Sequence, residues 1–222
     1  MKKLGVLLLA VLSVALFAPQ AQAQGVTYGL KVGFNYASAT FKTVLTDTPD
    51  LKYQIGAVEG IFVNFKLGPV TIQPELLYSQ RGTKWTEDEE PGVGVVTCHM
   101  RISYVELPVL VKYNFLSGPV RPFVLAGPSL GYLLSAKWQY CVHYYTDDGV
   151  DNSYEYDMKD QLKKMEFAGV FGIGADYHLA KVVLSLEARY HFGLTNVIKS
   201  IEESDVTSAK HKGFTVLVGL GF

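Results

Sequence analysis

The side chains that could do chemistry in this sequence are charged groups at alternate positions of otherwise apolar segments. Such positions hold four acids and five bases: Glu75, Glu106, Asp176, Glu187, Lys31, Arg81, Lys112, Arg121 and Arg189. Alternate positions of an extended strand face the same side, so these groups would share one enclosed space. Charges withdrawn from water must be paired, because an unpaired buried ion is costly. We therefore expect a salt-bridged network, with Glu106 and the Glu187–Arg189 pair as its hubs.

Nucleophilic chemistry is the rival interpretation of the same positions. Ser185, Glu187 and His191 share one parity, and these are the residue types of a hydrolytic triad. No G-x-S-x-G motif positions the serine. The six-residue step from Ser185 to His191 spans about 20 Å at roughly 3.3 Å per residue, which exceeds hydrogen-bond reach. We therefore expect these three residues to pack in the lumen, and we expect neither an enzyme nor a cofactor. Enzymatic modification of outer-membrane lipid is kept as a second alternative function.

The two cysteines, Cys98 and Cys141, lie beyond the ends of neighbouring apolar segments. If Phe115 and Val120 oppose each other across the turn "LSGP", Cys141 lies four residues from the position opposite Cys98. Bulges at the prolines of these segments (Pro108, Pro122 and Pro128) could absorb that offset. An oxidising compartment then predicts a Cys98–Cys141 disulfide. A metal site that adds His99 and His143 stays open as the alternative, although its spacing is less regular than that of zinc frameworks.

The nine charged residues and the three triad residues lie on eight segments in which apolar residues alternate with small or polar ones, a pattern that predicts strands. The segments are 26–38, 55–67, 70–82, 102–115, 120–134, 166–177, 182–194 and 213–222. In the last one, "GFTVLVGLGF", one face is aliphatic and aromatic and the other is mostly glycine. Neither face suits bulk water, so we expect lipid on one side and a crowded lumen on the other.

The connections between the segments alternate in length. Those after the second, fourth and sixth segments are tight, whereas the other four are long and polar, around 38–54, 83–99, 136–164 and 195–211. Short turns at one rim and long loops at the other are typical of outer-membrane barrels. The sequence therefore predicts an all-β fold, an eight-stranded antiparallel up-and-down transmembrane β-barrel.

The N-terminus indicates export. Lys2 and Lys3 precede an apolar run, and the run is followed by the cleavage motif Ala21-Gln22-Ala23. This order predicts a signal peptide at 1–23 and a barrel domain at 24–222. The net charge of −1 lacks the basic excess of a nucleic-acid-binding protein, so we expect no nucleic-acid partner.

Several stretches, among them "IQPELLYSQRGTK", "ISYVELPVLVKYNF" and "RPFVLAGPSLGYLL", resemble the outer-membrane β-barrel family often called "porin family protein". Its members are small eight-stranded barrels of Gram-negative bacteria, similar in build to OmpA- and OmpX-type proteins. The resemblance implies a monomer surrounded by outer-membrane lipid, with a C-terminal strand ending at Phe222 that the barrel-insertion machinery reads.

The function that we expect is structural, or surface recognition through the long loops. The longest loop is rich in tyrosine and small polar residues, which suits an extracellular protein or glycan ligand. An eight-stranded barrel is only just wide enough for its own side chains, so we expect a plugged lumen. A narrow channel for the passive diffusion of small solutes is the first alternative.

Overall fold

The computed structural model describes residues 25–43, 52–90, 94–144, 151–180, 182–199 and 206–222, and most of them lie in strands. The strands are β1 (Val26–Thr43), β2 (Lys52–Leu67), β3 (Val70–Glu90), β4 (Gly94–Asn114), β5 (Val120–Tyr144), β6 (Asp151–Asp157), β7 (Met165–Leu179), β8 (Val182–Gly193) and β9 (Val206–Gly221). A single 3-10 turn, η1 (Lys159–Gln161), interrupts them within the described part. The predicted signal peptide at 1–23 lies outside the described residues. Among the described residues, no helix has the length and apolar character to cross a bilayer.

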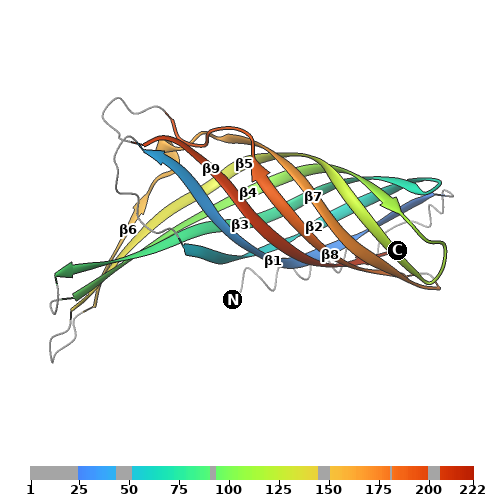
Figure 1. The fold of residues 1–222 in the computed structure, drawn as a ribbon, viewed down its shortest axis with the longest axis horizontal. Helices are drawn as coiled ribbons and strands as arrows, with labels where there is room; N and C mark the ends of the chain where they lie inside the picture. Colours follow the sequence, from blue (N-terminus) through green and yellow to red (C-terminus); the bar gives the residue numbers. More distant parts are fainter. Residues whose placement is uncertain (1–24, 44–51, 91–93, 145–150, 181, 200–205) are drawn as a thin grey trace.

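Eight of these strands close into a barrel. Their hydrogen-bonded order is β4-β3-β2-β1-β9-β8-β7-β5, and a further β4–β5 pairing joins the two ends. Every pairing is antiparallel. Figure 1 shows the resulting elongated barrel, with the C-terminus near the end that carries the short turns. The predicted eight-stranded antiparallel barrel is confirmed.

The alternation of side chains separates an apolar exterior from a filled lumen. On β9, Phe214 is 55 % exposed and Val218 51 % exposed, whereas Leu217 between them is completely buried. Gly174 on β7 shows how tightly the lumen is packed, since a Cβ built there would lie 2.4 Å from the Phe123 ring. The apolar exterior therefore forms the belt that a bilayer requires, and glycine on the inner face makes room for large side chains.

Three strands extend well past this belt at the long-loop end. We expected long polar loops at 83–99 and 136–164, but β3, β4 and β5 continue through much of these ranges. The short strand β6 adds to the free side of β5. The ends of β3 to β6 thus form a protruding sheet, visible at the left of Figure 1. The prediction was wrong here because strand pairing and side-chain alternation do not stop at the membrane surface.

The register between β4 and β5 also differs from the expectation. The three prolines that were expected to cause bulges lie in ladders without a shift. The register shifts instead between Ser103 and Tyr104, above the apolar belt. This position determines which residues meet across the protruding sheet.

Candidate functional site

The lower half of the lumen holds a network of paired charges. The Nζ atom of Lys31 lies 2.6 Å from Glu75 Oε1 and 2.6 Å from Glu187 Oε1. Arg189 donates from Nη1 to Glu75 Oε2 at 2.6 Å and from Nε to Glu187 Oε2 at 2.8 Å. Gln73 donates to Glu75 at 2.7 Å. Both carboxylates therefore lie between the same two cations, and each side chain is almost completely buried.

A second ion pair extends this network toward the short-turn end. Lys112 donates to Asp176 Oδ1 at 2.8 Å, and Ser185 donates to the same oxygen at 2.9 Å. Arg121 was expected to belong to the network. It is only half-buried, and its Nε donates to the carbonyl oxygen of Gly118 at 2.9 Å, so the structure uses it in the turn before β5.

The upper half of the lumen holds a separate cluster around Arg81. Its Nη2 donates to Glu106 Oε1 at 2.6 Å, and its Nη1 lies 3.4 Å from Glu166 Oε2. The Nδ1 atom of His211 lies 3.2 Å from both oxygens of Glu166, so this nitrogen carries the proton. The Nδ1 atom of His191 lies 3.0 Å from Arg81 Nη2. Eight of the nine predicted charges are therefore paired inside the barrel, but in two clusters.

Sequence reasoning missed two members of the upper cluster. Glu166 begins the sixth predicted segment and shares its parity with Asp176, so the alternation alone could have placed it in the lumen. His211 lay in a range that was assigned to a loop, although its parity matches Leu217 on the same strand. Glu166 lay inside an expected strand but was not counted among the lumen charges, whereas His211 was missed because the last expected strand began too late, at residue 213.

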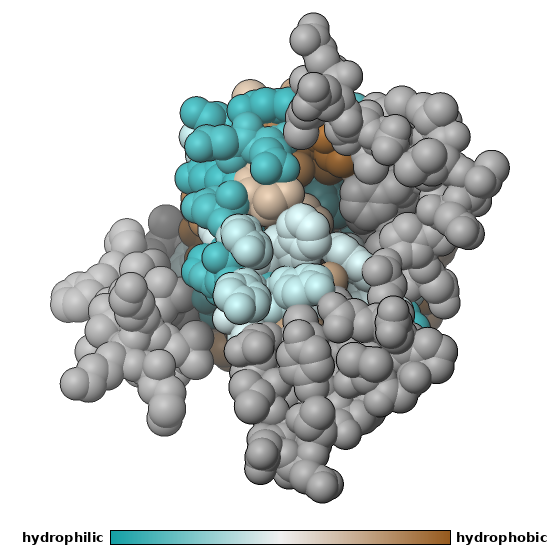
Figure 2. Space-filling model, turned by 90° about the vertical axis from the view of Figure 1, so that its left-hand side faces the viewer, coloured by the Kyte–Doolittle hydropathy of each residue, from teal (hydrophilic) through white to brown (hydrophobic). Residues whose placement is uncertain are grey.

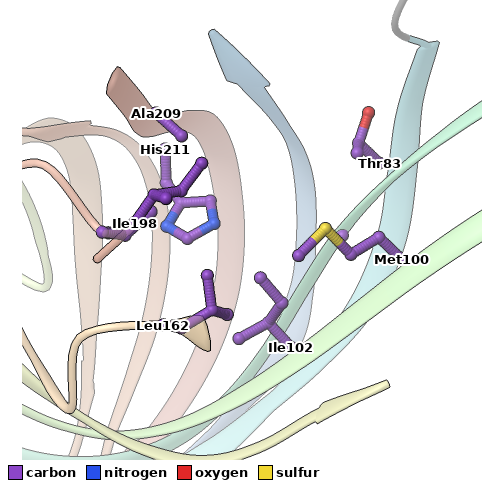
Figure 3. A pocket seen from close by; sticks show the side chains of 9 residues that line it. Thr83, Met100, Ile102, Leu162, Ile198, Ala209 and His211 are labelled. Atoms are coloured by element: carbon purple, nitrogen blue, oxygen red, sulfur yellow. The ribbon is translucent and has the colours of Figure 1, made fainter. Parts of the chain in front are cut away.

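An apolar cap closes the lumen above the upper cluster. Leu162, which follows η1, forms a β-bridge with Ile198, which follows β8. Leu162 packs with the lumen-facing residues Ile102 and Tyr104. Figure 3 shows Leu162, Ile102 and Ile198 converging with Met100 on a small cavity of about 20 Å³. Two connecting segments, 158–164 and 194–199, therefore cover the charges from the long-loop side.

A second small cavity lies between the two charged clusters. Its volume is about 20 Å³, and Arg81, Glu106, Arg189 and His191 are among its lining residues. That space is about enough for one water molecule. The Nε2 atom of His191 is buried without a protein partner, so a water in this cavity would satisfy it. The space suits a trapped water, not the passage of a solute.

The triad residues take part in the charge network. Ser185 donates to Glu187 Oε1 at 3.2 Å, in addition to its bond with Asp176. His191 contacts Arg81 in the other cluster. Glu187 is held by two cations. The geometry therefore assigns these three residues to lumen packing and not to a nucleophile–base relay.

Neither Cys98 nor Cys141 forms a disulfide in the structure. Cys98 lies opposite Tyr140, and Cys141 lies opposite Thr97. The offset between the cysteines is thus one residue and not the four that we expected. Residues offset by one point to opposite faces of the sheet, so the expected disulfide does not form. For the alternative metal site, the described residues contain no group of three or more potential His, Cys, Asp or Glu ligands.

The protruding sheet carries an aromatic face on the side that continues the lumen. Trp138 lies opposite Tyr156, and Tyr140 lies opposite Tyr154. Trp85 lies beside Trp138, with ring centroids 5.9 Å apart and the ring planes tilted by 43°. The two outer tyrosines are more than half exposed, at 52 % for Tyr154 and 56 % for Tyr156. Seen from the long-loop end, the described surface is mostly hydrophilic, with a pale group of intermediate hydropathy near its centre (Figure 2).

Comparison with protein families finds one match for this architecture. The family model described as "outer membrane protein beta-barrel domain" matches residues 20–199. A comparison with curated protein sequences finds no significant match.

Solved structures with similar folds include several outer-membrane proteins. Neisserial surface protein A is 15 % identical, with 90 % of this chain and 100 % of that chain covered and a TM-score of 0.42. The attachment invasion locus protein Ail of Yersinia pestis, solved with the heparin analogue sucrose octasulfate, is 12 % identical, with 90 % and 100 % covered and a TM-score of 0.39. The outer membrane protease OmpT of Escherichia coli is 10 % identical, with 90 % and 97 % covered and a TM-score of 0.45.

Proposed function

Since the chain belongs to the outer membrane protein β-barrel domain family, we propose that it is a closed barrel that holds a recognition surface outside the cell. The family places the protein in the outer membrane, where barrels of this type direct their long connections outward. The protruding sheet and the capped end of the lumen lie at that outer side.

The charge balance of the lumen supports a closed barrel. The lower network pairs three bases with three acids: Lys31, Lys112, Arg189, Glu75, Asp176 and Glu187. Because the cations and carboxylates satisfy one another, an entering ion would have to displace a paired partner in a site with little water. The apolar cap adds a second barrier. These features favour a structural lumen over the alternative of a narrow solute channel.

The observation that carries the recognition proposal is the aromatic face of the protruding sheet. Tyrosine and tryptophan supply large contact area at a low cost in side-chain entropy, and their rings stack on apolar faces of sugars or of other side chains. Strands hold these rings more rigidly than loops would. We propose an extracellular glycan or protein as the partner, bound through the ring face.

The test compares two double variants of the same strand pair. Trp138→Ala with Tyr156→Ala removes two opposed rings, whereas Gln139→Ala with Ser153→Ala removes a polar contact from the other face. Barrels in nanodiscs are applied to glycan arrays and to immobilised extracellular matrix proteins. We expect a ligand whose affinity falls about 30-fold in the ring variant and stays unchanged in the control. Ligand binding that survives loss of the rings would overturn the proposal.

We also propose that the insertion machinery reads the end of β9. Phe222 pairs with Tyr28 across the β1–β9 seam, with its N–H donating to the Tyr28 carbonyl at 2.8 Å. The Phe222 side chain is 41 % exposed at the outside of the barrel. Deletion of Phe222 should lower the amount of folded barrel in the outer membrane without changing the midpoint of urea unfolding in vitro. An unchanged yield in cells would contradict this role.

A further inference from the structure

The outward face of the protruding sheet, opposite the aromatic face, carries like charges in direct opposition. Arg101 on β4 lies opposite Lys137 on β5, and Lys52 on β2 lies opposite Lys84 on β3. All four side chains are exposed. Like charges directly opposite each other destabilise a sheet, so this arrangement calls for a negative counter-charge.

The protein supplies only part of that counter-charge. Glu155 pairs with Lys137 at 2.5 Å, and Asp157 lies opposite Lys137 on β6. The Nε atom of Arg101 donates to the side-chain oxygen of Gln54 at 3.3 Å once the amide of Gln54 is oriented to satisfy its hydrogen bonds. Within the described residues, no carboxylate pairs with Arg101 or Lys84. Burial lowers the pKa of His99, and the positive charges of Arg101 and Lys84 lower it further.

Two of these cations, Arg101 and Lys137, line a groove that continues down to the apolar belt. Its volume is about 530 Å³. At its lower edge, Phe34 is 50 % exposed and Ile55 is 70 % exposed. Above them, polar side chains lie in one row across β3, β4 and β5: Gln80, Ser103 and Ser135. Arg101 and Lys137 lie one step farther from the belt. The lining therefore changes from apolar to polar to cationic along the barrel axis.

We propose that this groove binds the phosphate-bearing headgroup of a lipid in the outer leaflet, with Arg101 and Lys137 holding the phosphate and Phe34 and Ile55 contacting an acyl chain. The order of the lining groups matches the order of groups in such a lipid. The planar fork of the Arg101 guanidinium fits two phosphate oxygens at once. A soluble anion has no apolar part that could contact Phe34 and Ile55. A lipid is therefore the occupant that fits best.

The experiment measures lipid retention by native mass spectrometry of the detergent-solubilised barrel. The probes are lipid A, a doubly phosphorylated acyl-glucosamine lipid, and its dephosphorylated form. Arg101→Gln with Lys137→Gln removes the two cations that are proposed to hold the phosphate. Lys163→Gln with Lys164→Gln is the matched control, since it removes two exposed cations near the same end of the barrel. A heat-dependent shift in gel mobility verifies that both variants are folded.

We expect the wild type and the control to bind lipid A equally. The groove variant should bind it about 30-fold more weakly. Dephosphorylated lipid A should bind equally weakly to the wild type and to the groove variant. A variant with the two cations exchanged, Arg101→Lys with Lys137→Arg, should bind lipid A as the wild type does. Equal losses in both glutamine variants would show a general attraction to positive charge and overturn the proposal. So would inorganic phosphate that displaces lipid A at matched concentration, because the site would then be an anion site without a lipid component. The aromatic face is not involved, so this result is independent of the recognition test.

Discussion

Replacing Arg189 by methionine is the sharpest perturbation of the lumen. The arginine donates four hydrogen bonds to two buried carboxylates, those of Glu75 and Glu187. After Arg189→Met, both acids remain buried with Lys31 as the cation between them. Methionine fills much of the space but supplies no charge, so the lower network changes from balanced to an excess of one negative charge.

The expected cost follows from that imbalance. Removing one partner of a buried ion pair lowers the free energy of unfolding by about 3–5 kcal/mol, because the remaining charge stays buried and cannot regain its hydration. A second change, Glu187→Gln, removes the excess charge and leaves Lys31 paired with Glu75. The double variant should therefore cost about 2 kcal/mol less than the sum of the two single variants.

The assay is urea unfolding of the barrel in lipid vesicles, followed by far-ultraviolet circular dichroism. If the free energy of unfolding falls by about 2–3 kcal/mol per molar urea, Arg189→Met should lower the urea concentration at the unfolding midpoint by about 1–2.5 M. Lys137→Met is the matched control. Its pair with Glu155 is 54 % exposed on both sides, and exposed pairs contribute about 0–1 kcal/mol.

Two results would refute this reasoning. A midpoint shift in Arg189→Met no larger than that in Lys137→Met would mean that water already reaches the network. A double variant as unstable as the sum of its parts would mean that Arg189 and Glu187 are not energetically coupled.

Three further predictions concern packing, thiols and the fold. Gly174→Ala should lower the free energy of unfolding by about 1–3 kcal/mol, because its Cβ would lie 2.4 Å from the buried Phe123 ring. Gly169→Ala should cost less, because the Phe192 ring that it meets points outward and can move into lipid. Equal urea midpoints for the two variants would contradict this. Thiol titration of the denatured, unreduced protein should find free thiols at both Cys98 and Cys141; a peptide linking them would require a different β4–β5 register. The folded barrel should migrate differently on a detergent gel before and after boiling, and a heat-independent mobility would be incompatible with the closed barrel.

The parity of side chains made most of the barrel predictable from the sequence. Period-two alternation is a local property, so it assigned Glu75 and Arg189 to the lumen before any pairing was known. Partner choice was not predictable in the same way. Lys31 and Glu187 lie 156 residues apart, and their contact depends on closure of the barrel.

The errors in the prediction came from boundaries and register. The protruding sheet was assigned to loops because polar composition was given more weight than the alternation that brings Trp85 and Trp138 to one face. The cysteine pairing failed because one residue of register reverses the face of a strand. A bulge at Ser103 and Tyr104, which no proline marks, set that register.

The central claim is that the lumen is closed, and single-channel recording in planar lipid bilayers tests it most directly. The cavity below the apolar cap and the cavity between the two charge clusters have a volume of about 20 Å³ each. The wild-type barrel should therefore produce no conductance steps in 1 M KCl, even though its folded insertion is verified in the same vesicles. Stable, repeatable ion conductance by the folded wild-type protein would contradict the account.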